Sequence, residues 1–159
     1  MMPAIDIVKD VAGFEALRPA WSDLLQRSAT KEPTLDPAWM LAWWRVFGPL
    51  GGRRLRIVTV HEGARLVGIA PLLLRTHWYL PGLPYRRLEL LGSGEPQEDE
   101  ICSDYIGIVA EKGAERAVVG ALVRALFDRG AFDEWDELVM PSMAGDGVIP
   151  ALLAEALRE

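Results

Sequence analysis

The hydrophobic period of the chain changes near its middle, and this change constrains the fold more than any other feature. Before the change, apolar residues recur every three or four positions over 14–25, which predicts an amphipathic helix. Pro19 interrupts that stripe, so the helix is expected either to begin near Arg18 or to be kinked there. An N-cap aspartate followed by proline predicts a second helix over 36–49. A short strand is expected at 5–8, before both helices.

Beyond the second helix, the period is that of β-strands. The runs 55–60 and 66–74, joined by a turn at 62–63, predict an antiparallel hairpin. The second run is apolar on both faces, as in a central strand that is covered on both sides. Pro71 within this run has no amide hydrogen, which predicts a bulge or a lost ladder partner at that position.

The second half of the chain alternates strands and helices. The expected elements are a strand at 87–91 after a turn at 81–84, a loop at 92–104, a strand at 105–109, a helix at 114–129 that ends at Gly130, a strand at 135–140 and a helix at 148–157. The whole order is a strand, two helices, three strands, and then strand, helix, strand, helix. This order predicts a single domain of the mixed α/β class.

Composition excludes several classes of protein. Half of the 159 residues are apolar, which excludes a disordered chain, and a single cysteine excludes a disulfide scaffold. The longest apolar run, 66–74, has nine residues, whereas roughly 20 are needed to cross a bilayer. The first ten residues lack the basic and apolar stretches of a signal peptide. A cytoplasmic protein without a membrane span is therefore expected.

The formal charge of −6 conceals an uneven distribution. Between Arg45 and Leu90 there are eight arginines and only two acidic residues, so the rest of the chain is strongly acidic. Nucleic-acid-binding domains tend to be basic throughout, and no nucleic-acid partner is predicted here. A basic middle segment either attracts phosphates or forms a solvated face, and the second interpretation is favoured.

Cys102, beside Ser103 and Asp104, is a candidate nucleophile. A thiolate needs an adjacent base, and nothing in the spacing brings His61 or His77 near it. An unreactive thiol with surface histidines is the favoured interpretation. One cysteine and two histidines also fall short of the four ligands that a structural zinc site usually takes, so no metal is predicted.

Several segments together resemble one family of enzymes. They are Trp21 in the first helix, Asp36-Pro37-Ala38-Trp39, Trp43-Trp44-Arg45, Phe47-Gly48, Leu66 to Leu72, Leu90-Leu91-Gly92 and Ser103-Asp104-Tyr105. With the order of elements, they resemble the GNAT acyltransferases. Within these they resemble the CelD-type proteins of cellulose and other exopolysaccharide biosynthesis, which are related in architecture to the FemAB transferases. The resemblance covers nearly the whole chain.

This resemblance implies a mixed, mainly antiparallel sheet flanked by helices. Residues 1–159 are then a single GNAT-like domain, expected to be the N-terminal half of a longer protein built from two such halves. The implied cofactor is acetyl-CoA or another acyl-CoA.

In the GNAT family, the cofactor's pyrophosphate lies at a glycine-rich turn before a helix. The equivalent turn here offers Lys112, Gly113 and Arg116. It has one glycine where the family has two, and Glu111 and Glu115 bring negative charge to the place of the anion. Acidic side chains at a helix N-terminus suit capping of the helix better than anion binding. A degenerate cofactor site is therefore expected.

Acyl transfer to an amine needs a base and an acid, and the resemblance implies Asp104 and Tyr105 for these roles. The structural alternative is that Asp104 ends a loop and Tyr105 opens a strand with its ring in the core. Trp44 and Arg45 lie off the helix face that carries Trp39, which is expected to be buried. They are therefore candidates to stack on a sugar or acyl group, or to dock a second half.

Two functions remain open. In the first, the chain is the N-terminal half of an acyl-CoA-dependent N-acyltransferase of envelope or exopolysaccharide biosynthesis. The amine of a small-molecule or sugar acceptor would attack the thioester directly. In the second, the chain is a non-catalytic scaffold that docks a second GNAT-like half or a copy of itself. The second interpretation is favoured for this chain alone.

Overall fold

The computed structural model describes residues 3–101, 103–128, 132 and 135–158. Its strands are β1 (Ala4–Val8), β2 (Arg54–Glu62), β3 (Arg65–Leu80), β4 (Leu83–Leu90), β5 (Val109–Ala110) and β6 (Glu137–Val139). Its α-helices are α1 (Val11–Arg27), α2 (Pro37–Phe47), α3 (Glu115–Phe127) and α4 (Val148–Ala156). Short 3-10 turns occur at Pro33–Leu35, Leu50–Gly52 and Gln97–Asp99.

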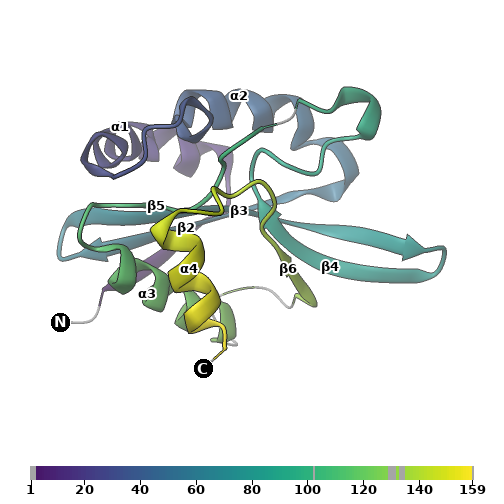
Figure 1. The fold of residues 1–159 in the computed structure, drawn as a ribbon. Coiled ribbons are helices and arrows are strands. Elements are labelled where there is room, and N and C mark those ends of the chain that lie inside the picture. The colour runs from purple at the N-terminus through teal and green to yellow at the C-terminus, as the bar shows by residue number, and fades with distance from the viewer. Residues whose placement is uncertain (1–2, 102, 129–131, 133–134, 159) are drawn as a thin grey trace.

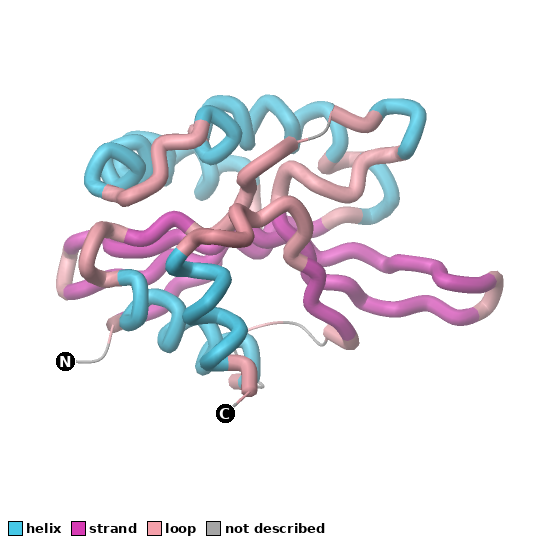
Figure 2. Tube along the Cα trace, viewed as in Figure 1, coloured by secondary structure: helices cyan, strands magenta, loops and turns pink. Residues whose placement is uncertain are grey.

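The strands of the described residues form one open, mostly antiparallel sheet. Its order is β1-β2-β3-β4-β6, with β5 paired to β3, and only β4 and β6 run parallel. Helices α1 and α2 cover one face of the sheet, and α3 and α4 cover the other (Figure 1). Figure 2 shows the same three layers as two sets of helices with the strands between them. The predicted mixed α/β class, with a mainly antiparallel sheet flanked by helices, is confirmed.

Local capping signals set where the first two helices begin. The carboxylate of Asp10 accepts a hydrogen bond from the Gly13 amide (2.7 Å), and that of Asp36 accepts one from the Ala38 amide (2.8 Å). Helix α1 therefore starts at Val11 and continues through Pro19, so a start near Arg18 is wrong. The burial of apolar side chains on both sides of the proline outweighs the backbone hydrogen bond that is lost there.

The sheet forks along one edge of β3. Strand β5 pairs with β3 at residues 68–69, whereas β4 pairs with it from Leu72 onward, so both lie on the same edge. Pro71 lies between the two pairings, and its carbonyl accepts from the Leu91 amide (2.8 Å). A residue in an antiparallel ladder points its N–H and C=O to the same side. The missing donor of Pro71 therefore faces the fork, where no strand needs it, and the β2–β3 register passes Pro71 without a bulge.

Helix α3 packs directly on β3 beside this fork. A Cβ atom added to Gly68 would lie 2.4 Å from Cγ1 of Val118, well inside contact distance. Glycine is needed here so that the helix can approach the strand closely. This contact fixes the position of α3 and of the turn that precedes it.

Several expected boundaries differ from those of the structure. The strand expected at 105–109 is reduced to β5, because the chain turns at Tyr105, whose φ is +58°. The strand expected at 135–140 is limited to Glu137–Val139, and α3 ends at Phe127. Gly130, the expected helix terminator, lies outside the described residues. Strands β3 and β4 extend to Leu80 and from Leu83, so their hairpin is longer than predicted.

Candidate functional site

The turn before α3 is the first candidate site, because the resemblance assigns the cofactor's pyrophosphate to it. Each of its four backbone N–H groups donates to an acceptor within the chain. The bonds run from Glu111 to the Val67 carbonyl (2.9 Å), from Lys112 to the Arg27 carbonyl (3.1 Å), from Gly113 to the Glu115 carboxylate (2.8 Å) and from Ala114 to the Glu111 carbonyl (2.9 Å). A phosphate cradle depends on free backbone N–H groups, and here the chain's own oxygen atoms occupy them.

The side chain of Glu111 holds this turn against the body of the domain. Its carboxylate forms ion pairs with the guanidinium groups of Arg27, from α1, and Arg65, from β3. Arg27 also donates to the Leu66 carbonyl (3.0 Å). An arginine held by a carboxylate is less available to a phosphate. Two basic groups near the turn are therefore already committed within the chain.

A cavity of about 310 Å³ lies beside the turn. Arg65, Lys112, Glu62 and Glu111 contribute its charged groups, so bases and acids are balanced there. Gly113 also lines it and has a φ of +91°, a conformation that favours glycine. Arg116 does not line this cavity. It is exposed on α3 and pairs with Glu155 of α4 (3.3 Å).

A second pocket, of about 230 Å³, lies between the helical layers near the fork. Its walls are the segments 29–35, 105–110 and 143–150. Most lining side chains are apolar, and Glu115 adds a carboxylate. The backbone of 147–150 begins α4, and Glu115 begins α3, so the N-termini of two helices border the pocket. Such a pocket suits an apolar group with a polar or anionic end.

Tyr105 stands at the second pocket, but Asp104 does not line it. Tyr105 is 55% exposed. This differs from the expectation that Tyr105 begins a strand and packs its ring in the core. Its left-handed backbone is unusual for a bulky residue and is held by the loop around it. The Asp104 carbonyl accepts from the Thr34 hydroxyl (2.9 Å), which ties this loop to the connection between α1 and α2.

Trp39 and Trp44 of α2 lie differently from the prediction. Trp44 is buried at 9% exposure and belongs to the core with Trp43, whereas Trp39 is only partly buried. Helix α2 buries a wider face than one stripe, because Leu41 and Trp44 are buried as well as Met40, Trp43 and Phe47. Trp44 therefore offers no open stacking platform. Arg45 is exposed and pairs with Glu15 of α1 (2.6 Å).

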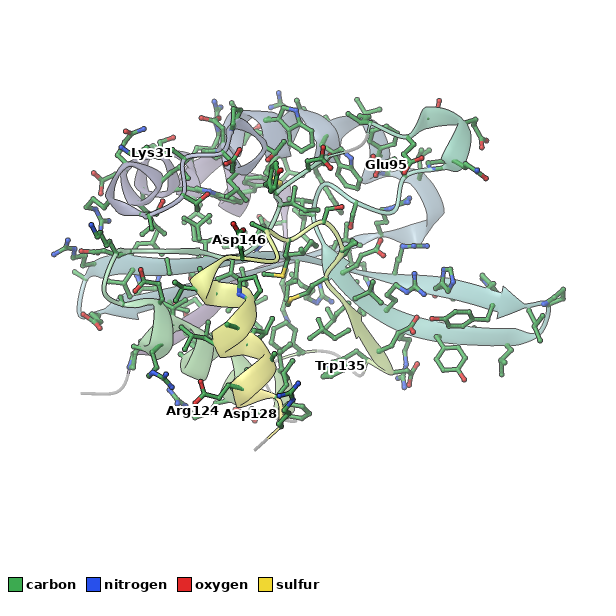
Figure 3. The ribbon with its side chains drawn as sticks, in the orientation of Figure 1. Lys31, Glu95, Arg124, Asp128, Trp135 and Asp146 are labelled. Atoms are coloured by element: carbon green, nitrogen blue, oxygen red, sulfur yellow. The ribbon has the colours of Figure 1, made fainter. Side chains whose placement is uncertain are left out.

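The base of the β3–β4 hairpin carries a network of charged pairs. Arg75 pairs with the buried Glu89 (2.5 Å). Glu95, labelled in Figure 3, lies on the loop that follows β4. Burial, together with the nearby Arg75, lowers the pKa of Arg53, which donates to the Gly94 carbonyl (2.5 Å). The bond from Arg53 ties the loop after β4 to the segment that precedes β2.

The arginines in the outer part of the hairpin are also paired with carboxylates of the same chain. Arg86 pairs with Asp136 (2.8 Å) and Arg87 with Glu137 (2.7 Å). The hydrogen bonds from Arg86 lower the pKa of Asp136 to about 2. Arg75 and Arg87 are mostly buried and paired, so the interpretation of the basic segment as a solvated face is wrong for them.

Among the residues that the structure describes, the remaining candidates His61 and His77 come together in no site. Cys102 lies outside the described residues. His61 contacts the Thr59 hydroxyl (3.1 Å), and His77 packs edge-on against Tyr79, on different parts of the sheet. No cluster of three metal-ligating side chains exists among the residues that the structure describes. Across the same residues, no helix is long and apolar enough to span a bilayer.

The sequence identified the charged residues of the turn but not the residues that pair with them. Glu111 and Glu115 were identifiable as helix-capping acids, but Arg27 and Arg65 come from elements far away in the chain. The only early signal was the excess of arginine in the middle of the chain and of acids elsewhere. The second pocket had no sequence signal, because its three walls meet only in the fold.

Comparisons with known proteins add no assignment. No family model matches the chain, and no significant match is found among curated proteins or among solved structures.

Proposed function

We propose that this chain is a GNAT-like domain of an acyl-CoA-dependent N-acyltransferase of envelope or exopolysaccharide biosynthesis, and that it acts within that enzyme as a non-catalytic scaffold. A second GNAT-like half would hold the acyl-CoA, and this chain would dock that half or a copy of itself. The acceptor would be an amine on a small molecule or a sugar.

One observation carries the scaffold role. The four N–H groups at 111–114 are satisfied by the chain itself, with the Glu115 carboxylate on the Gly113 amide. An incoming pyrophosphate would have to displace acceptor oxygen atoms that belong to the same chain as the N–H groups and are already bonded to them. It would also meet the negative charge of Glu115 before any gain from the helix dipole, which contributes only about 0.3–1 kcal/mol per charge. The turn is therefore better suited to fixing α3 than to binding CoA.

A catalytic role is the second candidate, and the pocket beside Tyr105 favours it. An apolar pocket of about 230 Å³ between two helix N-termini suits the acyl end of a thioester. In that role, the amine would attack the thioester carbonyl and the C–S bond would break. The Tyr105 hydroxyl would protonate the departing thiolate, and Asp104 would accept the proton of the amine. Replacement of Tyr105 by Phe would then abolish thiol release in an acetyl-transfer assay.

Isothermal titration of acetyl-CoA and of CoA into the 159-residue chain separates the two roles. The scaffold role predicts no heat of binding. Micromolar binding that is lost in Gly113→Trp would overturn it and make this domain a cofactor site. Gly82→Trp is the matched control, because Gly82 also has a positive φ (+83°) and open space around it but lies at the tip of the β3–β4 hairpin.

A further inference from the structure

The far end of the β3–β4 hairpin extends beyond the layers of helices (Figure 1). We call residues 75–86 the arm. Its exposed apolar side chains are Trp78 (58%), Tyr79 (52%), Leu80 (64%) and Leu83 (46%). A group of large apolar side chains gathered at one projecting tip marks a surface for interaction more often than a free surface.

One strand edge of the arm is closed. Pro84 and Arg86 lie opposite Trp78 and Thr76 in the β3–β4 ladder. Their backbone groups point away from β3, to the outer edge of the hairpin. Pro84 has no N–H to offer there. Both backbone groups of Arg86 are bound to Asp136. The Arg86 N–H donates to the Asp136 carboxylate (2.8 Å), and the Arg86 carbonyl accepts from the Asp136 N–H (2.8 Å). These are the devices by which proteins protect a sheet edge.

The opposite edge of the arm, on β3, is bordered at its base by the 3-10 turn Leu50–Gly52 and is paired to no strand beyond it in the described part of the chain. The β2–β3 ladder ends at the pair Arg54 and Leu74, and among the described residues no strand continues beside β3 beyond it. The backbone groups of Thr76 and Trp78 point to this side, since those of Val67 and Pro71 point to the β5–β4 side. The arm thus offers two residues with outward donors and acceptors, flanked by exposed aromatic side chains.

We propose that this open edge pairs with the same edge of a second copy of the chain, as antiparallel strands related by a two-fold axis at His77. The proposal deepens the scaffold role and rests on it for the choice of a like chain as partner. A two-fold axis at His77 sets Thr76 of each chain opposite Trp78 of the other. The backbone groups of both residues are then bonded in both chains. An axis at Thr76 would need Leu74, whose outward groups already face β2.

Charge and side-chain packing favour a like partner at this edge. Each arginine of the arm and its base, at 75, 86 and 87, is paired with a carboxylate of its own chain, so two arms can approach without uncompensated repulsion. The two His77 side chains would face each other across the axis. Burial and the nearby Arg87 and Arg75 lower the pKa of His77, which keeps the imidazole neutral at pH 7.

Sedimentation velocity over a concentration series, from about 5 to about 500 µM, tests the pairing, because a short interface gives modest affinity. The expected result is a concentration-dependent shift from 17.6 kDa to twice that mass. Thr76→Pro removes the outward N–H and should abolish the dimer, whereas Thr76→Ala keeps that N–H and should retain it. A wild-type chain that is monomeric throughout, or a Thr76→Pro chain that still dimerises, overturns the proposal.

A crosslinking experiment fixes the register and does not depend on the proline variant. In the Cys102→Ser background, His77→Cys places two thiols at a non-hydrogen-bonded antiparallel pair, where Cα atoms lie about 4.5 Å apart and a disulfide can form. Mild oxidation should yield a covalent dimer from this variant and none from Tyr85→Cys, which lies on β4 opposite His77. Equal crosslinking of both overturns the register.

The two proposals fail separately. A chain that dimerises through the arm and also binds CoA would remove the scaffold role and leave the dimer. A monomer that binds no CoA would remove the arm pairing and leave the scaffold role.

Discussion

Tyr105 offers the sharpest test of the backbone at the second pocket. Its φ of +58° is a left-handed conformation that costs a residue with a Cβ atom about 1–2 kcal/mol. Glycine adopts it without that cost, but loses about 0.4–1 kcal/mol of unfolded-chain entropy relative to alanine. Both Tyr105→Ala and Tyr105→Gly remove the same ring, so its lost contacts cancel in the comparison. The glycine variant should therefore be the more stable by about 1 kcal/mol.

Urea unfolding followed by circular dichroism measures this difference. Val46, which is 62% exposed in α2, supplies the control, because at a helical position the alanine variant should be more stable than the glycine variant. There, Val46→Gly should be less stable than Val46→Ala by about 1 kcal/mol. If Tyr105→Gly were also less stable than Tyr105→Ala, the left-handed turn and its role in shaping the pocket would be refuted.

Three further predictions follow from the packing and the ion pairs. Gly68→Ala should lower the free energy of unfolding by about 1–3 kcal/mol. In a Val118→Ala background, which makes room for the new methyl group, urea unfolding should show a smaller loss. Strictly additive losses would contradict the close contact. Glu89→Gln should cost about 3–5 kcal/mol, because it leaves Arg75 without its buried partner, and a double replacement by Met should cost less; thermal unfolding that shows no loss for Glu89→Gln would contradict this. Asp136 has a folded pKa of about 2 against 3.8 for the free group, so it stabilises the fold above pH 3.8 and this contribution is lost as the pH falls through 2; a carboxyl NMR titration with a midpoint near 3.8 would contradict the pairing with Arg86.

The features that sequence reasoning predicted were those set by local signals. Helix α2 runs as expected, because Asp36, Pro37 and Gly48 determine its ends over a few residues. The hairpin of β2 and β3 was recognisable from the change of period and the turn at 62–63. In both cases, neighbours in the sequence carry the information that fixes the backbone.

The features that it missed depend on contacts between distant segments. The chain turns at Tyr105 where a strand was expected, since the loop from 92 to 104 is anchored from elsewhere, by Thr34 and by Arg53. Trp44 is buried because α2 buries a wider part of its surface than one stripe, which the spacing of its apolar residues alone does not reveal. The turn at 111–114 could be judged poor for an anion from its glutamates, but the occupation of its N–H groups needed the fold.

The scaffold role depends on the turn before α3 being closed by the chain's own oxygen atoms, three backbone carbonyls and the Glu115 carboxylate. The most direct test is a CoA titration followed by the backbone amide resonance of Gly113, whose N–H donates to Glu115 (2.8 Å). If the turn is closed, this resonance stays in place up to millimolar CoA and moves when Glu115 is replaced by Ala. A saturable shift of the Gly113 resonance in the unchanged protein would mean that pyrophosphate displaces the carboxylate, and it would contradict the claim.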